Sequence, residues 1–375
     1  MSTTHVSKIK IKKGDRVFVR VDFNVPIKSG KVSDSFRIDE SKKTIDFLVS
    51  KGARIILISH IGKDGKESLK PVASFLKKEY EIFFSEDILG KKVEEKISEM
   101  EPGEIMLLEN IRKEPGEMEN TKLFAIELSR LADIYVNDAF SVSHRAHASI
   151  VSLPKILPSY IGFRFATEVS ELSKVLLKPA FPFLFILGGK KFETKMPLIT
   201  KFLNTADEVF IGGALANNFL KEEGHKIGKS LIDEQAPDLS PLIKNPKLLL
   251  PIDIKVTKND TTHVVGLDEV SRSEVIVDIG PKTIDMLAPY IKKAKMILWN
   301  GPLGKDEHIE GTKALLDLIA AQKKAIRIIG GGDTVEIISK YDMHNEVGFV
   351  STGGGATLYF LSTGTLPGLE ALGKE

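Results

Sequence analysis

The chain has 375 residues, of which 42% are hydrophobic and 28% charged, and its formal net charge is +2. This composition predicts a folded chain of about two domains and argues against a disordered protein. The balanced charge argues against nucleic-acid binding, and the lack of cysteine excludes disulfide bonds and thiol chemistry. We find no secretory signal and only short apolar runs, so we expect a cytoplasmic protein without a membrane partner.

The first half of the chain alternates predicted strands with predicted helices. Residues 16–23 and 54–59 are rich in β-branched and apolar side chains and read as strands, as do residues 105–108 and 134–136. Helical spacing is found between them, at residues 39–50, after Ser68 with Pro71 in the first turn, and at residues 121–131. This alternation predicts βαβ units that build a parallel sheet.

Polar side chains follow these strands where each one ends. Nine of them are candidates for one shared site: Asp22, Asn24, Arg37, His60, Lys63, Arg112, His144, Arg145 and His147. Taken singly, each has an ordinary alternative as a turn residue, a core histidine or a solvated surface charge. The carboxyl ends of parallel strands form the usual ligand edge, and arginine suits carboxylate and phosphate groups. We therefore expect a site for a small anion in the first half.

The second half opens on a predicted buried strand, residues 184–187, that runs into Gly188-Gly189. A glycine pair allows backbone N–H groups to approach an anion, and the helix that follows adds its positive end. Lys191 and Lys195 supply mobile positive charge one helical turn apart. A polyphosphate needs these features, although an ordinary strand–turn–helix with solvated lysines fits this stretch alone equally well.

The alternation then repeats, with strands predicted at residues 208–211, 247–250, 274–277, 296–299, 326–329 and 347–350. Several of these strands end in glycine clusters, at residues 212–213, 330–332 and 353–355, which suits a nucleotide. Asp333 directly follows one cluster, where it could cap a helix or bind Mg²⁺. Between the halves, Pro154 and Pro158 break the pattern, and a helix at residues 163–177 is predicted to connect two domains.

Three tempting motifs carry little weight. Residues 224–230 resemble a phosphate-binding Walker A loop, but the glycines are separated by three residues where four are needed. No strand is followed by G-x-G-x-x-G, which removes the main signal of a nicotinamide dehydrogenase. His144 and His147 have a spacing found in metal sites, but no further ligand cluster accompanies them.

Taken together, nine segments make the sequence resemble the phosphoglycerate kinase family almost from end to end. They are VRVDFNVP (19–26), SHIGK (59–63), LLENIR (107–112), NDAFSVSHRAHAS (137–149), FILGGKK (185–191), DIGPKT (278–283), WNGPLG (299–304), GGGDT (330–334) and STGGGAT (351–357). The resemblance implies an α/β fold of two doubly wound parallel-sheet (Rossmann-like) lobes joined by a hinge helix. The boundaries we expect are 1–160 for the phosphoglycerate-binding lobe, 161–180 for the hinge, 181–360 for the nucleotide-binding lobe and 361–375 for a tail packing back on the first lobe.

The resemblance also implies a role for individual residues. Substrate binding falls on Asp22, Asn24, Arg37, His60, Lys63, Arg112 and Arg145. Nucleotide binding falls on Gly189, Lys191, Lys195, Gly213, Asn300, Glu307, Gly332, Asp333, Thr334, Gly353 and Gly354. The implied catalytic groups are Arg37, Lys191, Gly332 and Gly355, and Asp333 is the implied ligand of Mg²⁺. Three positions depart from the family pattern: Lys63 replaces an arginine, residues 141–143 replace a small-residue run, and Lys190 replaces a small residue.

The implied reaction is reversible phosphoryl transfer between 1,3-bisphosphoglycerate and MgADP, giving 3-phosphoglycerate and MgATP in glycolysis and gluconeogenesis. Phosphoryl transfer depends on positioning and charge neutralisation, and an acyl phosphate needs no general base. Two ligands on two lobes imply closure during turnover. We expect a monomer that uses Mg²⁺ with the nucleotide. A catalytically silent nucleotide-binding protein is the other alternative, and it would not need to keep Arg37, Lys191 and Asp333.

Overall fold

The computed structural model describes residues 3–259, 261–305 and 307–373. The chain divides into two compact units. Unit 1 comprises Met1–Ser170 and Thr365–Glu375, and unit 2 comprises Glu171–Gly364. Helix α7 (Phe163–Leu177) carries the chain from unit 1 into unit 2, and the chain returns after Gly364. None of the described helices is both long and apolar enough to cross a membrane.

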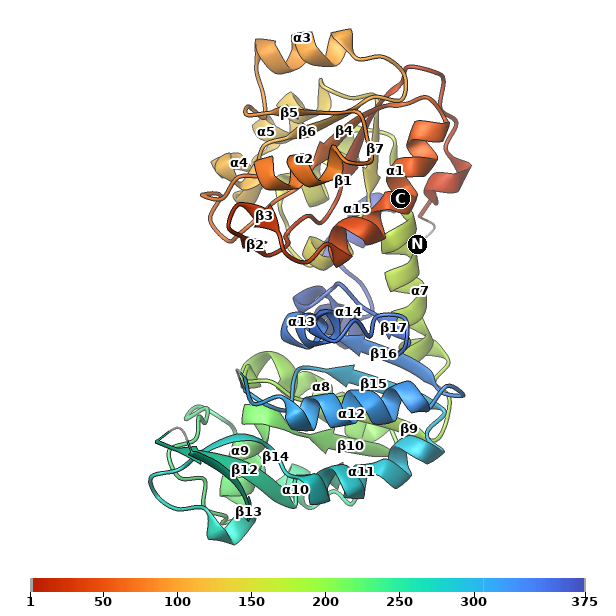
Figure 1. The fold of residues 1–375 in the computed structure, drawn as a ribbon. Helices are drawn as coiled ribbons and strands as arrows, with labels where there is room; N and C mark the ends of the chain where they lie inside the picture. The colour runs from red at the N-terminus through yellow and green to blue at the C-terminus, as the bar shows by residue number, and fades with distance from the viewer. Residues whose placement is uncertain (1–2, 260, 306, 374–375) are drawn as a thin grey trace. The chain divides into compact units, whose positions relative to one another are not determined.

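Unit 1 is built on a six-stranded parallel sheet in the order β5-β6-β4-β1-β7-β8 (Figure 1). Its strands are β1 (Arg16–Arg20), β4 (Arg54–Ile58), β5 (Ile82–Ser85), β6 (Ile105–Leu108), β7 (Ile134–Asn137) and β8 (Ser159–Ile161). Its α-helices are α1 (Phe36–Ser50), α2 (Lys70–Leu76), α3 (Lys91–Glu99), α4 (Pro115–Met118), α5 (Lys122–Ser129), α6 (Leu153–Ile156) and α15 (Pro367–Leu372). Short elements complete the unit: the hairpin β2 (Ile27–Lys28) and β3 (Lys31–Val32), the 3₁₀ helices Val6–Lys8, Ile111–Lys113 and Phe140–Val142, and one π-helical turn, Ala148–Ser152.

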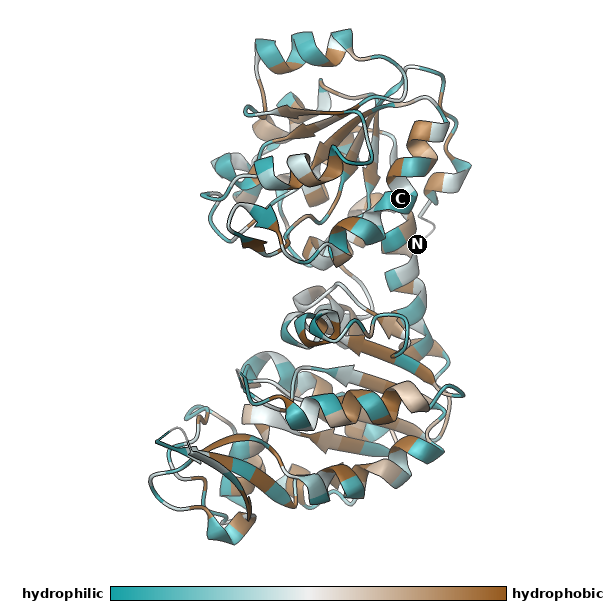
Figure 2. Cartoon of the chain, in the orientation of Figure 1, coloured by the Kyte–Doolittle hydropathy of each residue, from teal (hydrophilic) through white to brown (hydrophobic). Residues whose placement is uncertain are grey.

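The core of unit 1 lies on the faces of this sheet. In the register of β1 with β4, Val17 pairs with Ile55 and Val19 with Leu57, and all four side chains are fully buried. Most residues of these strands are apolar because both faces of the sheet are covered, so the strands were predicted without an alternating pattern (Figure 2). β5 and β8 were not predicted from the sequence, because β5 is only partly buried and β8 has three residues, which is too few to give a clear period.

Unit 2 has its own six-stranded parallel sheet in the order β11-β10-β9-β15-β16-β17. Its strands are β9 (Phe183–Leu187), β10 (Glu208–Ile211), β11 (Leu248–Leu249), β15 (Met296–Asn300), β16 (Ile326–Gly330) and β17 (Phe349–Val350). Its α-helices after α7 are α8 (Phe192–Thr205), α9 (Gly213–Glu222), α10 (Ser240–Ile243), α11 (Pro281–Lys293), α12 (Glu310–Ala321), α13 (Gly332–Lys340) and α14 (Gly355–Thr363). The α/β fold class with two parallel sheets is therefore confirmed.

One predicted strand belongs elsewhere. We expected residues 274–277 to continue the alternation of the parallel sheet, but this prediction is wrong. The segment forms β14 (Val275–Ile279), which pairs antiparallel with β12 (Asp253–Lys258) in a separate three-stranded sheet with β13 (Thr261–Gly266). The sequence analysis had no prediction for β12 or β13, so it gave β14 no antiparallel partner. The short helix Leu267–Glu269 links β13 to the segment before β14.

In each sheet there is one point where the strand order reverses, so that successive strands are added first toward one edge and then toward the other. In unit 1, β1 lies between β4 and β7, so chain connections leave it toward both edges. In unit 2, β9 and β15 are neighbours, and later strands follow outward from each of them. Ligands of such sheets bind in the crevice outside the carboxyl ends of the strands at this reversal. The residues after β1 and β7, and those after β9 and β15, are therefore the first places to look for a site.

Candidate functional site

The carboxyl edge of unit 1 holds a network around Asp22, directly after β1. The Asp22 side chain is buried, and its Oδ2 accepts hydrogen bonds from the Arg37 guanidinium and the Ser141 hydroxyl. Arg37 lies in the first turn of α1, and Ser141 lies in the 3₁₀ helix after β7. The network therefore spans the reversal between β1 and β7 and fixes one face of the Arg37 fork.

A buried contact between His60 and Arg20 lies at the same edge. His60, which follows β4, is 2% exposed, and its Nδ1 lies 3.4 Å from Nη2 of Arg20. Arg20 is fully buried at the end of β1, where it donates to the Ser149 hydroxyl and the Val21 carbonyl. Burial lowers the pKa of His60 well below its ordinary value, and Arg20 lowers it further. His60 is therefore neutral near pH 7, and the sequence analysis missed Arg20 as its partner.

Arg112 reaches the same edge from the 3₁₀ helix after β6. Its Nη1 donates to the Gly62 carbonyl at 2.6 Å, while its Nε is a buried donor without a partner among the described residues. Burial lowers the pKa of Arg112 to about 10, with further contributions from Arg20 and Arg145. Asn24 holds the facing loop, because its Oδ1 accepts from the Gly62 amide at 3.0 Å. A buried arginine with a free N–H beside other cations favours an anion.

Two predicted substrate residues lie farther out. Lys63 and Arg145 are exposed, and the described residues offer neither side chain a hydrogen bond or an ion pair. Arg145 nevertheless acts on its neighbours, because it is among the charges that lower the pKa values of His144 and His147 to about 4, after burial as the main cause. These histidines are neutral at pH 7, so they add no positive charge to this edge.

Glu117 is the buried counter-charge of this cluster, and the sequence analysis did not single it out. It is fully buried in α4 and accepts from the Ser149 amide at 2.8 Å and the Ser149 hydroxyl at 2.7 Å. Burial raises the pKa of Glu117, while Arg20 and Arg112 oppose this effect. For Asp22, burial alone would also raise the pKa, but Arg37 leads the interactions that lower it overall. Both carboxylates therefore face arginines.

The carboxyl edge of unit 2 is made of closely packed backbone. The Gly188 amide donates to the Asn300 carbonyl at 2.9 Å, and the Gly189 amide donates to the Pro302 carbonyl at 2.8 Å. Gly213 has φ of +61°, and a side chain there would come within 2.8 Å of the Pro302 carbonyl. The glycine pair thus serves close packing of β9 against β15, and its two amides are not free for an anion as the sequence analysis expected.

Charged side chains stand above this packed backbone. Lys191 is exposed at the N-cap of α8, and Lys195 is buried one turn later with Nζ donating to the Gly188 carbonyl. Burial lowers the pKa of Lys195 to about 8, with Lys191 also lowering it and Asp333 raising it. Two cations and one carboxylate therefore lie within electrostatic reach of one another, above the ends of β9 and β16.

Helix starts supply the backbone donors that the glycine pair lacks. α13 begins at Gly332 after Gly331, which has φ of +105°, and α14 begins at Gly355 after Gly354, which has φ of +50°. The amides of a helix's first turn have no partner inside the helix. Thr334 Oγ1 and Asn300 Nδ2 are buried polar atoms without a partner among the described residues. Gly353 is less free, since its amide donates to the Ser351 hydroxyl.

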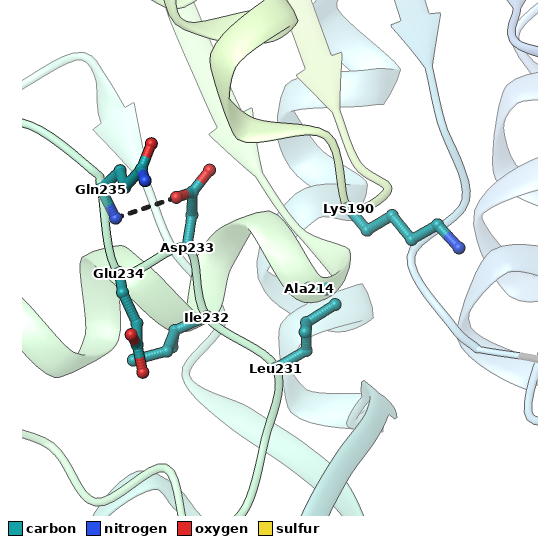
Figure 3. Close-up of a pocket in the computed structure, with 7 residues that line it drawn as sticks. All are labelled: Lys190, Ala214, Leu231, Ile232, Asp233, Glu234 and Gln235. Carbon is teal, nitrogen blue, oxygen red and sulfur yellow. Dashed lines mark hydrogen bonds between the residues drawn. The ribbon is translucent and has the colours of Figure 1, made fainter.

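The sequence analysis missed a hollow of about 320 Å³ beside this edge, because segments distant in sequence line it. Its wall is formed by Lys190, Ala214 and the loop 231–235 (Figure 3). Buried Asn217 and Asn218 of α9 hold the loop, with Asn217 Nδ2 donating to the Leu231 carbonyl and Asn218 Nδ2 to the Asp233 carbonyl. Glu307, another predicted nucleotide residue, is exposed, and its carboxylate lies 3.7 Å from Nε2 of the neighbouring His308.

The single carboxylate of Asp333 suits a metal ion that arrives with a bound ligand. No group of three or more His, Asp or Glu side chains suited to a metal occurs in the part of the chain that the structure describes. α13 has no side-chain cap, so Asp333 is not engaged as the helix cap that the sequence left open. Mg²⁺ commonly binds one or two carboxylates together with substrate phosphates. Asp333 therefore fits Mg²⁺ bound to a nucleotide better than a resident ion.

Comparison with known proteins agrees with this arrangement. The sequence model described as phosphoglycerate kinase matches residues 6–364. Curated proteins named phosphoglycerate kinase from Finegoldia magna and Moorella thermoacetica are each 41% identical to this chain, with 96% of both sequences covered in each case.

Solved structures give the same result for the fold. The phosphoglycerate kinase from Coxiella burnetii matches with a TM-score of 0.83 and 35% identity, over 99% of this chain and 98% of that one. The phosphoglycerate kinase from Pyrococcus horikoshii matches with a TM-score of 0.86 and 29% identity, over 98% of both chains. The resemblance inferred from the nine sequence segments is thereby confirmed, and this chain belongs to the phosphoglycerate kinase family.

Proposed function

We propose that this chain catalyses reversible phosphoryl transfer between 1,3-bisphosphoglycerate and MgADP, which yields 3-phosphoglycerate and MgATP. The observation that carries this proposal is the pair of positively charged edges, one at the strand reversal of each parallel sheet. One edge is built from arginine side chains, and the other from helix starts and lysines. Family membership and the names of the relatives support the same reaction.

The arginine edge of unit 1 suits phosphoglycerate, which carries a carboxylate and a phosphate. Arg37 and Arg112 offer planar forks that match both groups, and each is partly fixed by a protein acceptor. Neutral His60 can donate or accept a hydrogen bond without adding charge. Asp22 and Asn24 would act mainly by holding the arginine and the Gly62 loop in place, while exposed Arg145 and Lys63 would add charge from the rim.

The glycine and lysine edge of unit 2 suits a nucleoside diphosphate with Mg²⁺. Lys191 and Lys195 would contact phosphate oxygens of the nucleotide. Asp333 would hold the magnesium ion that arrives with the nucleotide. The unpartnered Thr334 hydroxyl and Asn300 amide would gain acceptors from such a ligand. The hollow beside Lys190 and Ala214 lies next to this edge and would take the base and ribose. Gly213, which precedes Ala214, and Glu307 are further candidates for contacts with the nucleotide.

The chemistry requires positioning and charge, and no added base. A terminal oxygen of the ADP β-phosphate attacks the acyl-phosphate phosphorus, the bond from phosphorus to the carboxyl oxygen breaks, and the carboxylate leaves with the electron pair. Lys191 and the first-turn amides at Gly332 and Gly355 would neutralise charge on the moving phosphoryl group, and Arg37 would orient the carboxyl end. In-line transfer brings the reacting atoms to about 3–3.5 Å, so the proposal includes approach of the two bound ligands during turnover.

A coupled assay tests the proposal directly. The purified chain is mixed with 3-phosphoglycerate and MgATP, and the 1,3-bisphosphoglycerate formed is consumed by a dehydrogenase that oxidises NADH. Loss of NADH absorbance that requires all three components is the expected result. Hydrolysis of ATP without dependence on 3-phosphoglycerate would contradict the proposal. The variant Lys191→Gln controls for contaminating activity, since it should retain the fold and lose turnover.

A further inference from the structure

Unit 1 contains a cavity of its own, at the opposite end of the strands from its carboxyl edge. Its volume is about 510 Å³, and its lining is Arg16, Arg54, Glu94, Ile97, Ser98, Arg130 and Leu131. Arg16 and Arg54 are the first residues of β1 and β4, and Arg130 directly follows α5, shortly before β7 begins. The cavity therefore lies at the amino ends of the central strands, which can be followed in Figure 1.

The same strands separate this cavity from the carboxyl edge. β1 begins with Arg16 in the cavity and ends with Arg20 behind His60, and β4 begins with Arg54 and leads to His60. A strand of five residues spans about 17 Å, so a small ligand cannot occupy both places at once. The cavity is therefore a distinct location within the described part of unit 1.

Charge in the cavity is only partly compensated. The Arg16 guanidinium is occupied by Asp133, with Nη2 to Oδ1 at 2.6 Å and Nε to Oδ2 at 3.1 Å. Arg54 donates through Nε to the Gly14 carbonyl at 2.7 Å, and neither it nor Arg130 has an ion pair within the described residues. With Glu94 as the other nearby carboxylate, three guanidinium groups face two acids. At least one positive charge is left for a ligand.

The rest of the lining sets the shape of that ligand. Ile97 of α3 and Leu131 are buried apolar residues that form part of the wall. The Ser98 hydroxyl donates to the Glu95 carbonyl at 2.6 Å, so its proton is already used and the donors for an anion are the arginines. A volume of this size falls within the usual range of small-molecule sites. The combination suits a compound with one strongly anionic group and a compact apolar body.

We propose that this amino-edge cavity is a second ligand site of unit 1, which binds the phosphate group of a small phosphorylated compound through Arg54 and Arg130. Arginine forks bind phosphate oxygens in pairs, and the apolar wall lies under the carbon skeleton of the ligand. Binding here is independent of the phosphoryl-transfer reaction, because none of the lining residues reaches the carboxyl edge.

Phenyl phosphate is a suitable probe, because it joins a phosphate to a compact ring. Calorimetry would be done on the full chain with saturating 3-phosphoglycerate and MgADP, so that the carboxyl edges of both units are filled and no phosphoryl transfer can occur. We expect binding of phenyl phosphate that weakens about tenfold in Arg130→Glu and in Arg54→Gln. Arg130 is exposed, and its side chain makes no hydrogen bond or ion pair with the described residues, so the first variant should fold normally.

The matched control is Lys122→Glu, which makes the same charge change at the exposed start of the same helix, α5. It should bind phenyl phosphate as the unaltered chain does, and all three variants should keep the kcat of the coupled assay. Equal affinity in Arg130→Glu and the unaltered chain would overturn the proposal. So would an equal loss in Lys122→Glu, since binding would then follow net charge and not this cavity.

Discussion

Arg37 donates a hydrogen bond to the buried carboxylate of Asp22, and the Ser141 hydroxyl donates to the same oxygen. This contact joins α1 to the segments that follow β1 and β7. The Arg37 side chain is 23% exposed, against 7% for Asp22, so the arginine keeps donors toward solvent while its orientation is fixed. A fork held in this way can receive an anionic ligand without first being ordered, which lowers the entropy cost of binding.

Arg37→Ala should reduce turnover at least about a hundredfold, roughly 2.7 kcal/mol of transition-state stabilisation, because the carboxyl end of the transferred group loses its clamp. The turnover of Arg37→Lys should lie between that of the unaltered chain and that of Arg37→Ala, since lysine keeps the charge and loses the planar fork. Steady-state rates in the coupled assay measure the effect, and thermal unfolding checks that the fold is kept. Near-normal turnover in Arg37→Ala would remove Arg37 from the catalytic groups.

Asp333→Asn should raise the MgATP concentration needed for half-maximal rate by about tenfold, roughly 1.4 kcal/mol, since the amide is a poor ligand for Mg²⁺. Affinity for 3-phosphoglycerate should stay unchanged, because that ligand is assigned to unit 1. Separate calorimetric titrations with MgADP and 3-phosphoglycerate distinguish the two effects. An equal loss for both ligands would indicate that Asp333 supports the fold.

Lys63→Ala should weaken 3-phosphoglycerate binding only about three- to fivefold, because an exposed charge contributes roughly 1 kcal/mol or less. Lys63→Arg should be tolerated and should tighten binding slightly, since the planar fork can pair with a phosphate. The matched control is Lys66→Ala, which removes another exposed lysine of the same loop. If Lys63→Ala binds as tightly as the unaltered chain, Lys63 lies outside the site.

The affinity for MgADP should fall as the pH rises past about 8. Burial lowers the pKa of Lys195 to about 8, so the empty site loses this positive charge in that range, while bound phosphate favours the charged form. Nucleotide binding at pH 8.5 should therefore take up part of a proton, which calorimetry in buffers of different ionisation enthalpy measures. Lys195→Gln should bind more weakly at every pH and show no such uptake. Persistent proton uptake in that variant would assign it to another group.

The sequence predicted the parallel strands well where they were long and apolar, as in β4 and β9, and where polar residues closed them, as at Asp22. Contacts between residues that are distant in sequence could not be predicted in this way. Arg20 looked like one more residue of a strand motif, yet burial places it against His60. The position of the loop 231–235 could not be predicted from its own sequence, because two buried asparagines of α9, more than ten residues earlier, hold it in place. The amides of Gly188 and Gly189 appeared free in sequence, but β15 and the loop after it accept both.

Each unit should bind one of the two reactants at its own carboxyl edge. Calorimetry can check this with 3-phosphoglycerate and MgADP each titrated into Arg112→Gln and into Lys191→Gln. We expect Arg112→Gln to lose at least about tenfold in affinity for 3-phosphoglycerate and to bind MgADP normally, and Lys191→Gln to show the reverse. If either variant loses both ligands equally, or if the two losses are exchanged, the assignment of one reactant to each unit is wrong.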